Sequence, residues 1–130
     1  GVITAANASS ISDGAAALLI GSGLDAEPLA KILAYSRHAG APEQFPVAPV
    51  YAVEKLMKGL GWGAGDVDLF EINEAFAMVA LLPHKLLGIP LEKINVSRSV
   101  RGGSFYSSLP RFLFPFTLPA KSLFAAIKPS

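Results

Sequence analysis

The chain has 130 residues, enough for one small domain with a hydrophobic core. Hydrophobic residues make up 52% and charged residues 16%, which is typical of a buried sheet or an interface rather than a solvated linker. The net charge of +1 gives no reason to expect a nucleic-acid partner, and the absence of cysteine excludes disulfides, thiolate metal sites and a cysteine nucleophile within these residues. With two histidines, no membrane-length apolar run and no signal peptide at the start, we expect a cytoplasmic protein with no metal site and no membrane partner.

The amino-terminal part alternates small polar stretches with apolar runs. Residues 1–12 are small and polar, so a ligand could approach their backbone closely, although composition alone favours an ordinary loop. Ala15–Ile20 predicts a buried strand, and Leu29–Tyr35 predicts a second one. Ser36–Ala48 is rich in Ala, Gly and Pro and predicts a loop, in which His38 is expected at the surface.

Pro49–Leu60 has the periodicity of an amphipathic helix. Proline suits the first turn of a helix, and Gly61 is a suitable stop. The apolar residues that fall on one stripe are Val50, Val53, Met57 and Leu60. A strand at Val67–Ile72 follows, and the resulting strand–helix–strand order is typical of a parallel sheet.

Asn73 stands where this strand is expected to run directly into a second helix. Its amide would then lie at the carboxyl end of the strand, where open α/β sheets bind ligands. Two interpretations stay open: a helix N-cap, which spacing alone favours, or a group beside helix N–H donors that stabilises a partial negative charge. The apolar side of the helix would contain Phe76, Val79, Leu82 and Leu86. Pro83 should kink or end it, and Glu71 and Glu74 are expected in salt bridges or in solvent rather than as general acids.

Leu91–Val96 predicts a third strand, after which the composition changes sharply. Residues 1–96 hold all ten acidic residues and six of the eleven basic ones. Residues 97–130 hold five basic residues, no acidic residue and a Phe- and Pro-rich sequence. We therefore place a boundary at Ser97.

Two motifs resemble those of the thiolases, enzymes that join or split acyl groups carried on coenzyme A. The run Asn-Glu-Ala-Phe-Ala at 73–77 is similar to the family's Asn-Glu-Ala-Phe motif, whose Asn holds a water that helps form an oxyanion hole for the thioester carbonyl. The run Gly-x-x-Thr-Ala-x-Asn-Ala-Ser at 1–9, followed by Asp-Gly-Ala-Ala-Ala, is similar to the loop that lies against the pantetheine arm of coenzyme A. The roles implied by this resemblance are catalysis for Asn73, coenzyme contact for Ser9 with Ala5 and Ala8 beside it, a pocket lining for Phe76, and control of acyl size for Phe45, although an aromatic in a loop more often serves packing.

The resemblance implies an α/β fold, namely the layered thiolase fold in incomplete form, with a partial sheet and flanking helices. It assigns residues 1–23 to the end of the family's amino-terminal domain and residues 24–96 to the start of its carboxyl-terminal domain. Residues 97–130 form a basic tail without a match. Our hypothesis is that the reading frame changed near Val96, in which case the encoding DNA read in another frame contains the family's Gly-His-Pro codons.

The chain lacks most of the residues that thiolase chemistry uses. The nucleophilic cysteine, the Gly-His-Pro histidine and the acid/base cysteine are all missing, so we expect no turnover by this chain alone. By resemblance, the whole enzyme condenses two acetyl-CoA or cleaves a 3-ketoacyl-CoA as in fatty acid metabolism. It binds acyl-CoA as its substrate, uses no metal or other cofactor, and is a homo-oligomer. The alternatives are a non-catalytic acyl-CoA-binding or subunit-interaction module, and a plain α/β domain in which Asn73 only caps a helix.

Overall fold

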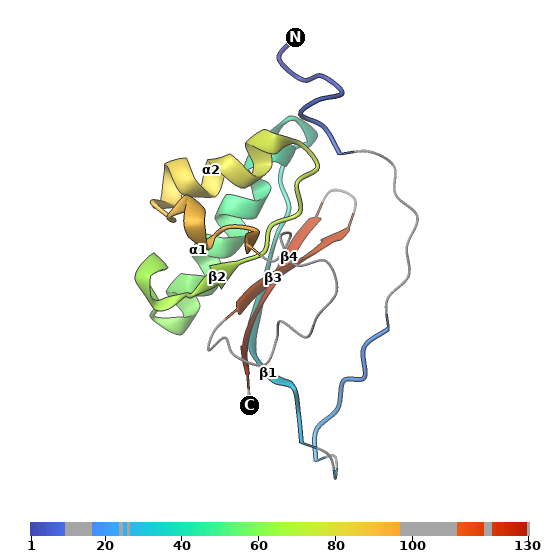
Figure 1. Cartoon of the computed structure of the whole chain (residues 1–130), viewed down its shortest axis with the longest axis vertical. Helices are drawn as coiled ribbons and strands as arrows, with labels where there is room; N and C mark the ends of the chain where they lie inside the picture. The colour runs from blue at the N-terminus through green and yellow to red at the C-terminus, as the bar shows by residue number, and fades with distance from the viewer. Residues whose placement is uncertain (10–16, 24, 26, 97–111, 119–120, 130) are drawn as a thin grey trace.

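Helices and short 3-10 helices cover one side of a four-stranded sheet (Figure 1). This computed structural model describes residues 1–9, 17–23, 25, 27–96, 112–118 and 121–129, the last two ranges for their backbone only. The strands are β1 (Ala30–His38), β2 (Leu69–Phe70), β3 (Phe112–Leu118) and β4 (Lys121–Pro129). The helices are α1 (Ala48–Leu60) and α2 (Ala77–Leu87), with 3-10 helices η1 (Pro42–Val47), η2 (Ala64–Asp66) and η3 (Leu91–Lys93).

The sheet is mixed, with the strand order β1-β4-β3-β2. β4 is antiparallel to both of its neighbours, whereas β2 is parallel to β3 and begins opposite Phe112. The register of β1 against β4 shifts between Ile32 and Ala34, which marks a bulge in β1. The arrangement of a sheet with helices packed on it agrees with the expected α/β class.

The core lies between α1, α2 and β2. Val53, Phe70 and Val79 are almost completely buried and belong to one apolar cluster with residues of the neighbouring turns. The predicted stripe on α1 is confirmed, because Val50, Val53 and Met57 are buried and Leu60 packs against the cluster. α1 therefore joins the sheet to α2, and it contacts β1 and β4 on one side and α2 on the other.

Both helices end at a glycine in the left-handed conformation. Gly61 has φ 67° and its N–H donates to the carbonyl of Lys58, as predicted for the end of α1. Gly88, also at φ 67°, donates to the carbonyl of His84 at the end of α2. Of the two effects predicted for Pro83, a kink or an end of the helix, the second does not occur, since α2 continues through this buried residue to Leu87. No helix among the described residues is long and apolar enough to cross a membrane.

The first predicted strand, Ala15–Ile20, is wrong over its described part. Residues 17–20 have no regular structure, and Leu18, Leu19 and Ile20 are 76%, 91% and 70% exposed. An apolar run becomes a strand only where a neighbouring strand takes its backbone hydrogen bonds, and no described strand pairs with these residues. Leu29–Tyr35, by contrast, is confirmed as a strand from Ala30 onward, within β1. The predicted loop Ser36–Ala48 is partly wrong, because it contributes the end of β1, all of η1 and the first residue of α1.

The third predicted strand, Leu91–Val96, is also wrong. Its first half is η3, and only Ile94 forms an isolated parallel bridge, with Phe70. Asn95 has φ 54°, a left-handed conformation that cannot continue an extended run. β2 itself is shorter than the predicted Val67–Ile72, because the backbone of Ile72 bonds to the side chain of Asn95 rather than to a strand.

Candidate functional site

The amino-terminal loop lies against the segment between β2 and α2, although the two are far apart in the sequence. Ala8 forms an antiparallel bridge with Phe76. Ser9 N–H donates to the carbonyl of Ala75 at 3.0 Å, and Ala77 N–H donates to the carbonyl of Asn7 at 2.9 Å. The two motifs singled out in the sequence are therefore joined by backbone hydrogen bonds on both sides of one bridge.

Asn7 gives the loop its shape. Its side-chain oxygen accepts from Thr4 N–H at 2.7 Å, and its side-chain nitrogen donates to the carbonyl of Val2 at 2.9 Å. Its own N–H donates to the carbonyl of Thr4 at 3.1 Å. Sequence analysis assigned no role to Asn7, although asparagine is a common organiser of turns through bonds of this kind. The compact loop leaves Ala5 and Ser9 exposed and Ala8 half-buried.

Asn73 is exposed and follows β2 at its carboxyl end. Its interpretation as a helix N-cap is wrong, because α2 begins four residues later and its N-cap is Phe76, which makes no side-chain capping bond. The delay has a physical cause: Phe76 is held by the amino-terminal loop in an extended bridge, and the carbonyl of Asn7 takes the first helical N–H, that of Ala77. The amide of Asn73 thus lies on a short segment without regular secondary structure between β2 and α2.

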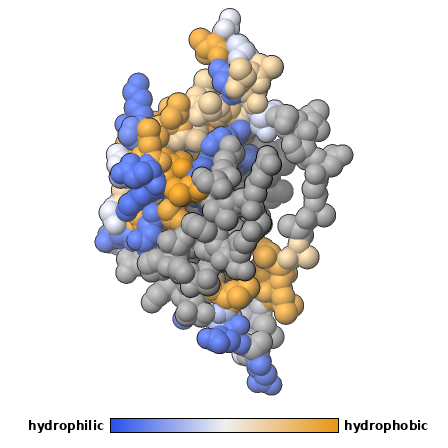
Figure 2. All heavy atoms as spheres, in the orientation of Figure 1, coloured by the Kyte–Doolittle hydropathy of each residue, from blue (hydrophilic) through white to orange (hydrophobic). Residues whose placement is uncertain are grey.

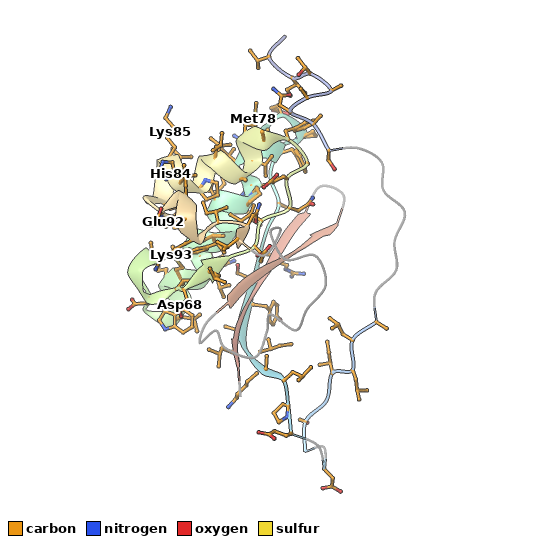
Figure 3. All side chains as sticks on the ribbon, in the orientation of Figure 1. Asp68, Met78, His84, Lys85, Glu92 and Lys93 are labelled. Atoms are coloured by element: carbon orange, nitrogen blue, oxygen red, sulfur yellow. The ribbon has the colours of Figure 1, made fainter. Side chains whose placement is uncertain are left out.

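Two aromatic side chains contact each other beside the segment that carries Asn73. The rings of Phe45 and Phe76 meet edge to face, with centroids 6.4 Å apart and planes at 87°. Phe45 lies in η1 rather than in a loop, and η1 contacts α2. Such an edge-to-face pair fixes both rings. Figure 3 places Met78, in the first turn of α2, beside the side chains of the amino-terminal loop, and Asp68, the residue before β2, far from that loop.

Asn95 is the second residue that sequence analysis missed. Its side chain bonds to both backbone groups of Ile72 and also to Glu74, the residues on either side of Asn73. Glu74 therefore accepts a hydrogen bond from an amide, an interaction that neither the salt-bridge nor the solvent interpretation named. A positive-φ asparagine is not apparent from periodicity, so the sequence offered no pattern that would identify it.

Each of the two histidines makes a contact with a neighbouring residue. His38 ends β1, is half-buried and packs against Tyr51, with ring centroids 4.8 Å apart, so it does not lie in the predicted loop. His84 is exposed as predicted and bonds to the carbonyl of Ile89. A shallow cavity of about 250 Å³ lies between Glu74, α2 and the region of η3. Its lining residues are Glu74, Ala77, Ala80, Leu81, Leu91 and Ile94. No group of three potential metal-ligating side chains occurs in the part of the chain that the structure describes.

Comparison with known proteins decides the family. Residues 26–105 match the sequence profile of the family described as Thiolase, C-terminal domain, which is more than half of the chain. The chain belongs to the thiolase family. Acetyl-CoA acetyltransferase 2 of Arabidopsis thaliana is 52% identical over 102 residues, a match that covers 75% of this chain and 25% of the plant protein. The mitochondrial acetyl-CoA acetyltransferase of Danio rerio is 44% identical over 102 residues, with 75% and 24% covered.

Solved thiolase structures share the fold. The crystal structure of a thiolase from Ascaris suum in complex with coenzyme A superimposes with a TM-score of 0.68 at 26% identity, covering 80% of this chain and 32% of that one. The acetyl-CoA acetyltransferase of Bacillus anthracis gives 0.66 at 25% identity, with 80% and 31% covered. The predicted thiolase-like α/β fold is therefore confirmed as a partial one. The chain spans about a quarter of the length of the curated relatives it matches.

Proposed function

We propose that this thiolase-family chain supplies two parts of a coenzyme A thioester site. The amino-terminal loop with Ser9, Ala5 and Ala8 receives the pantetheine arm, and Asn73 is the catalytic amide that steadies the thioester oxygen through a bound water. Phe76 lines the acyl pocket and Phe45 limits its size. The observation that carries the proposal is the bridge between Ala8 and Phe76, which brings the loop to the segment that displays Asn73.

For the whole enzyme we propose the chemistry of the family. It condenses two acetyl-CoA or cleaves a 3-ketoacyl-CoA, as in fatty acid metabolism, through an acyl group on a cysteine, with no metal or other cofactor. Negative charge develops on the thioester oxygen when a thiolate attacks it, and each donor aimed at that oxygen lowers the barrier by about 3 kcal/mol. This chain contains no cysteine, so it provides the donor but not the nucleophile, and we expect no turnover by the chain alone.

Binding of coenzyme A to the chain tests the proposal directly. Calorimetric titration with coenzyme A should show a one-to-one complex, and Ala5→Phe should weaken it about tenfold or more because the added ring fills the space beside the loop. Ala30→Phe is the matched control, since Ala30 is also exposed but lies at the start of β1, at the opposite end of the molecule (Figure 1). Equal affinities for the two variants, or no binding by the unmodified chain, would contradict the proposal.

The second candidate is a module that binds a partner subunit, and the exposed apolar side chains favour it. Leu18, Leu19 and Ile20 are largely exposed, and Figure 2 shows hydrophobic colouring at the lower right, where this segment runs. In this case a partner chain supplies the cysteines. Thiolysis of a 3-ketoacyl-CoA that appears only when the amino-terminal half of a thiolase is added would support this function, and activity of the chain alone would contradict both candidates.

Three further predictions from the sequence stay open to experiment. The division at residues 24 and 97, with a changed reading frame after Val96, is tested by reading the encoding DNA in the other two frames. Assembly into a homo-oligomer is tested by the solution mass of the chain with its amino-terminal half. The cytoplasmic location is tested by cell fractionation, and the relative from Danio rerio is named as mitochondrial.

A further inference from the structure

The side chain of Asn95 bonds to the residues on both sides of Asn73, which are Ile72 and Glu74. Its side-chain oxygen accepts from Ile72 N–H at 2.6 Å, and its side-chain nitrogen donates to the carbonyl of Ile72 at 2.9 Å. The same nitrogen donates to the carboxylate of Glu74 at 2.5 Å. A primary amide offers two donor hydrogens and an acceptor oxygen, and here both kinds of group are used within three residues of chain.

The backbone of Asn95 is shaped to make this possible. Its N–H donates to the carbonyl of Phe70 at 2.8 Å, so the residue starts as a strand neighbour of β2. Its φ of 54° then turns the backbone away from β2. The side chain of Asn95, instead of the next peptide group of a neighbouring strand, makes the hydrogen bonds to the backbone of Ile72. Among residues with a side chain, asparagine is one of the few that adopt this conformation readily. Its backbone conformation and its hydrogen bonds therefore serve the same contact.

We propose that Asn95 is a positioning residue that sets where Asn73 and the amino-terminal loop lie. Asn73 stands between the two residues that Asn95 holds, and β2 has already ended at Phe70, so no strand among the described residues fixes this segment. The next residue after Glu74 is Ala75, whose carbonyl accepts from Ser9 in the loop. Asn95 thus fixes the root of the segment on which the loop docks. The effect of Asn95 on ligand binding rests on the proposed function, whereas its hydrogen bonds to the backbone of Ile72 do not.

Three variants of the full chain separate this role from general stability. Asn95→Gly keeps the left-handed backbone accessible but removes the side-chain bonds. Asn95→Asp keeps the acceptor for Ile72 N–H and loses both donated bonds, leaving a carboxylate opposite Glu74. Combining Asn95→Asp with Glu74→Gln restores one bond with the donor and acceptor exchanged. Glu74→Gln alone is the control, because the glutamine oxygen still accepts from Asn95.

Amide hydrogen exchange of the isotope-labelled chain gives the first measurement. Ile72 N–H should exchange about tenfold faster in Asn95→Gly, because one hydrogen bond holds it. The amides of α1 should keep their rates, which shows that the loss is local rather than global. In Asn95→Asp the exchange of Ser9 N–H, which donates to the carbonyl of Ala75, should also rise, and Glu74→Gln in that background should bring it back toward the unmodified rate.

Titration with acetyl-CoA gives the second measurement. Asn95→Gly and Asn95→Asp should each raise the dissociation constant several-fold, about tenfold at most. The combined variant should recover part of this loss, whereas two residues that act independently of each other would give the sum of the two single effects. Unchanged exchange at Ile72, or a combined variant no better than Asn95→Asp, would overturn the proposal. If the unmodified chain binds no acetyl-CoA, the proposed function fails, and the exchange rates still decide the role of Asn95.

Discussion

Two regions of this molecule are built in opposite ways. The helical layer is held by burial, with Phe70, Val53 and Val79 almost inaccessible to solvent between α1, α2 and β2. The amino-terminal segment, residues 1–29, is exposed over nearly all of its described length. It is held at residues 7–9, where Ala8 forms the bridge with Phe76 and the backbone of Asn7 and Ser9 bonds to Ala77 and Ala75. A packed scaffold with a lightly held loop at one end is a common arrangement for a binding site, because the scaffold supplies rigidity and the loop supplies access.

The largest expected effect comes from the scaffold. Phe70→Ala should lower the free energy of unfolding by about 3–5 kcal/mol, because it leaves a large cavity at the centre of the apolar cluster. Denaturant unfolding followed by circular dichroism measures this. Leu19→Ala is the contrasting change in the exposed segment, and it should alter stability by no more than about 0.5 kcal/mol. Similar losses for the two variants would show that the segment is packed after all.

A smaller loss is expected where the scaffold meets the site. Phe45→Ala removes a half-buried ring and its edge-to-face contact with Phe76, so the unfolding free energy should fall by about 1–2 kcal/mol. The acyl pocket should also widen, which would show as a relative gain in affinity for longer acyl-CoA thioesters over acetyl-CoA. Phe45→Leu is the control, because it keeps most of the apolar contact. A loss of stability with no change in acyl preference would limit Phe45 to packing.

Within the loop, Asn7→Ala should affect binding more than stability. The change removes the two side-chain bonds to the backbone of Thr4 and Val2, which are exposed, so the unfolding free energy should drop by only about 0.5–1 kcal/mol. The loop would then sample other shapes, and coenzyme A affinity should fall several-fold in calorimetry. Asn7→Asp keeps the bond from Thr4 N–H and should lose less affinity. Equal losses for both variants would argue against this account of the loop.

The smallest effect on stability is expected at Asn73. Because the residue is exposed and does not cap α2, Asn73→Ala should change the unfolding free energy by no more than about 0.5 kcal/mol. A loss of about 1 kcal/mol, as an N-cap would show, would restore the capping interpretation. In a complete enzyme, formed with an amino-terminal half, the same change should lower the rate by about 100-fold or more if the amide serves the thioester oxygen.

The predictions that held depend on local patterns. The stripe on α1 and the stop at Gly61 follow from a period of 3.6 residues and from the ease with which glycine adopts positive φ. Several of the predictions that failed concern how far an extended run continues. Leu91–Val96 reads as a strand by composition, yet one left-handed residue, Asn95, ends its pairing with β2 after Ile94.

The sequence by itself determined the helical scaffold, the position of Asn73 after β2 and the kinship of both motifs to the thiolases, because these depend on residue type and spacing. Tertiary structure alone decided where α2 begins, since the loop at residues 7–9 takes up hydrogen bonds that an earlier first turn of α2 would have used. It also decided that Ala17–Ile20 is not a strand and that the amide of Asn95 replaces a peptide group beside Ile72. The presence or the absence of hydrogen-bond partners distant in sequence governs all three outcomes, and no local pattern encodes it.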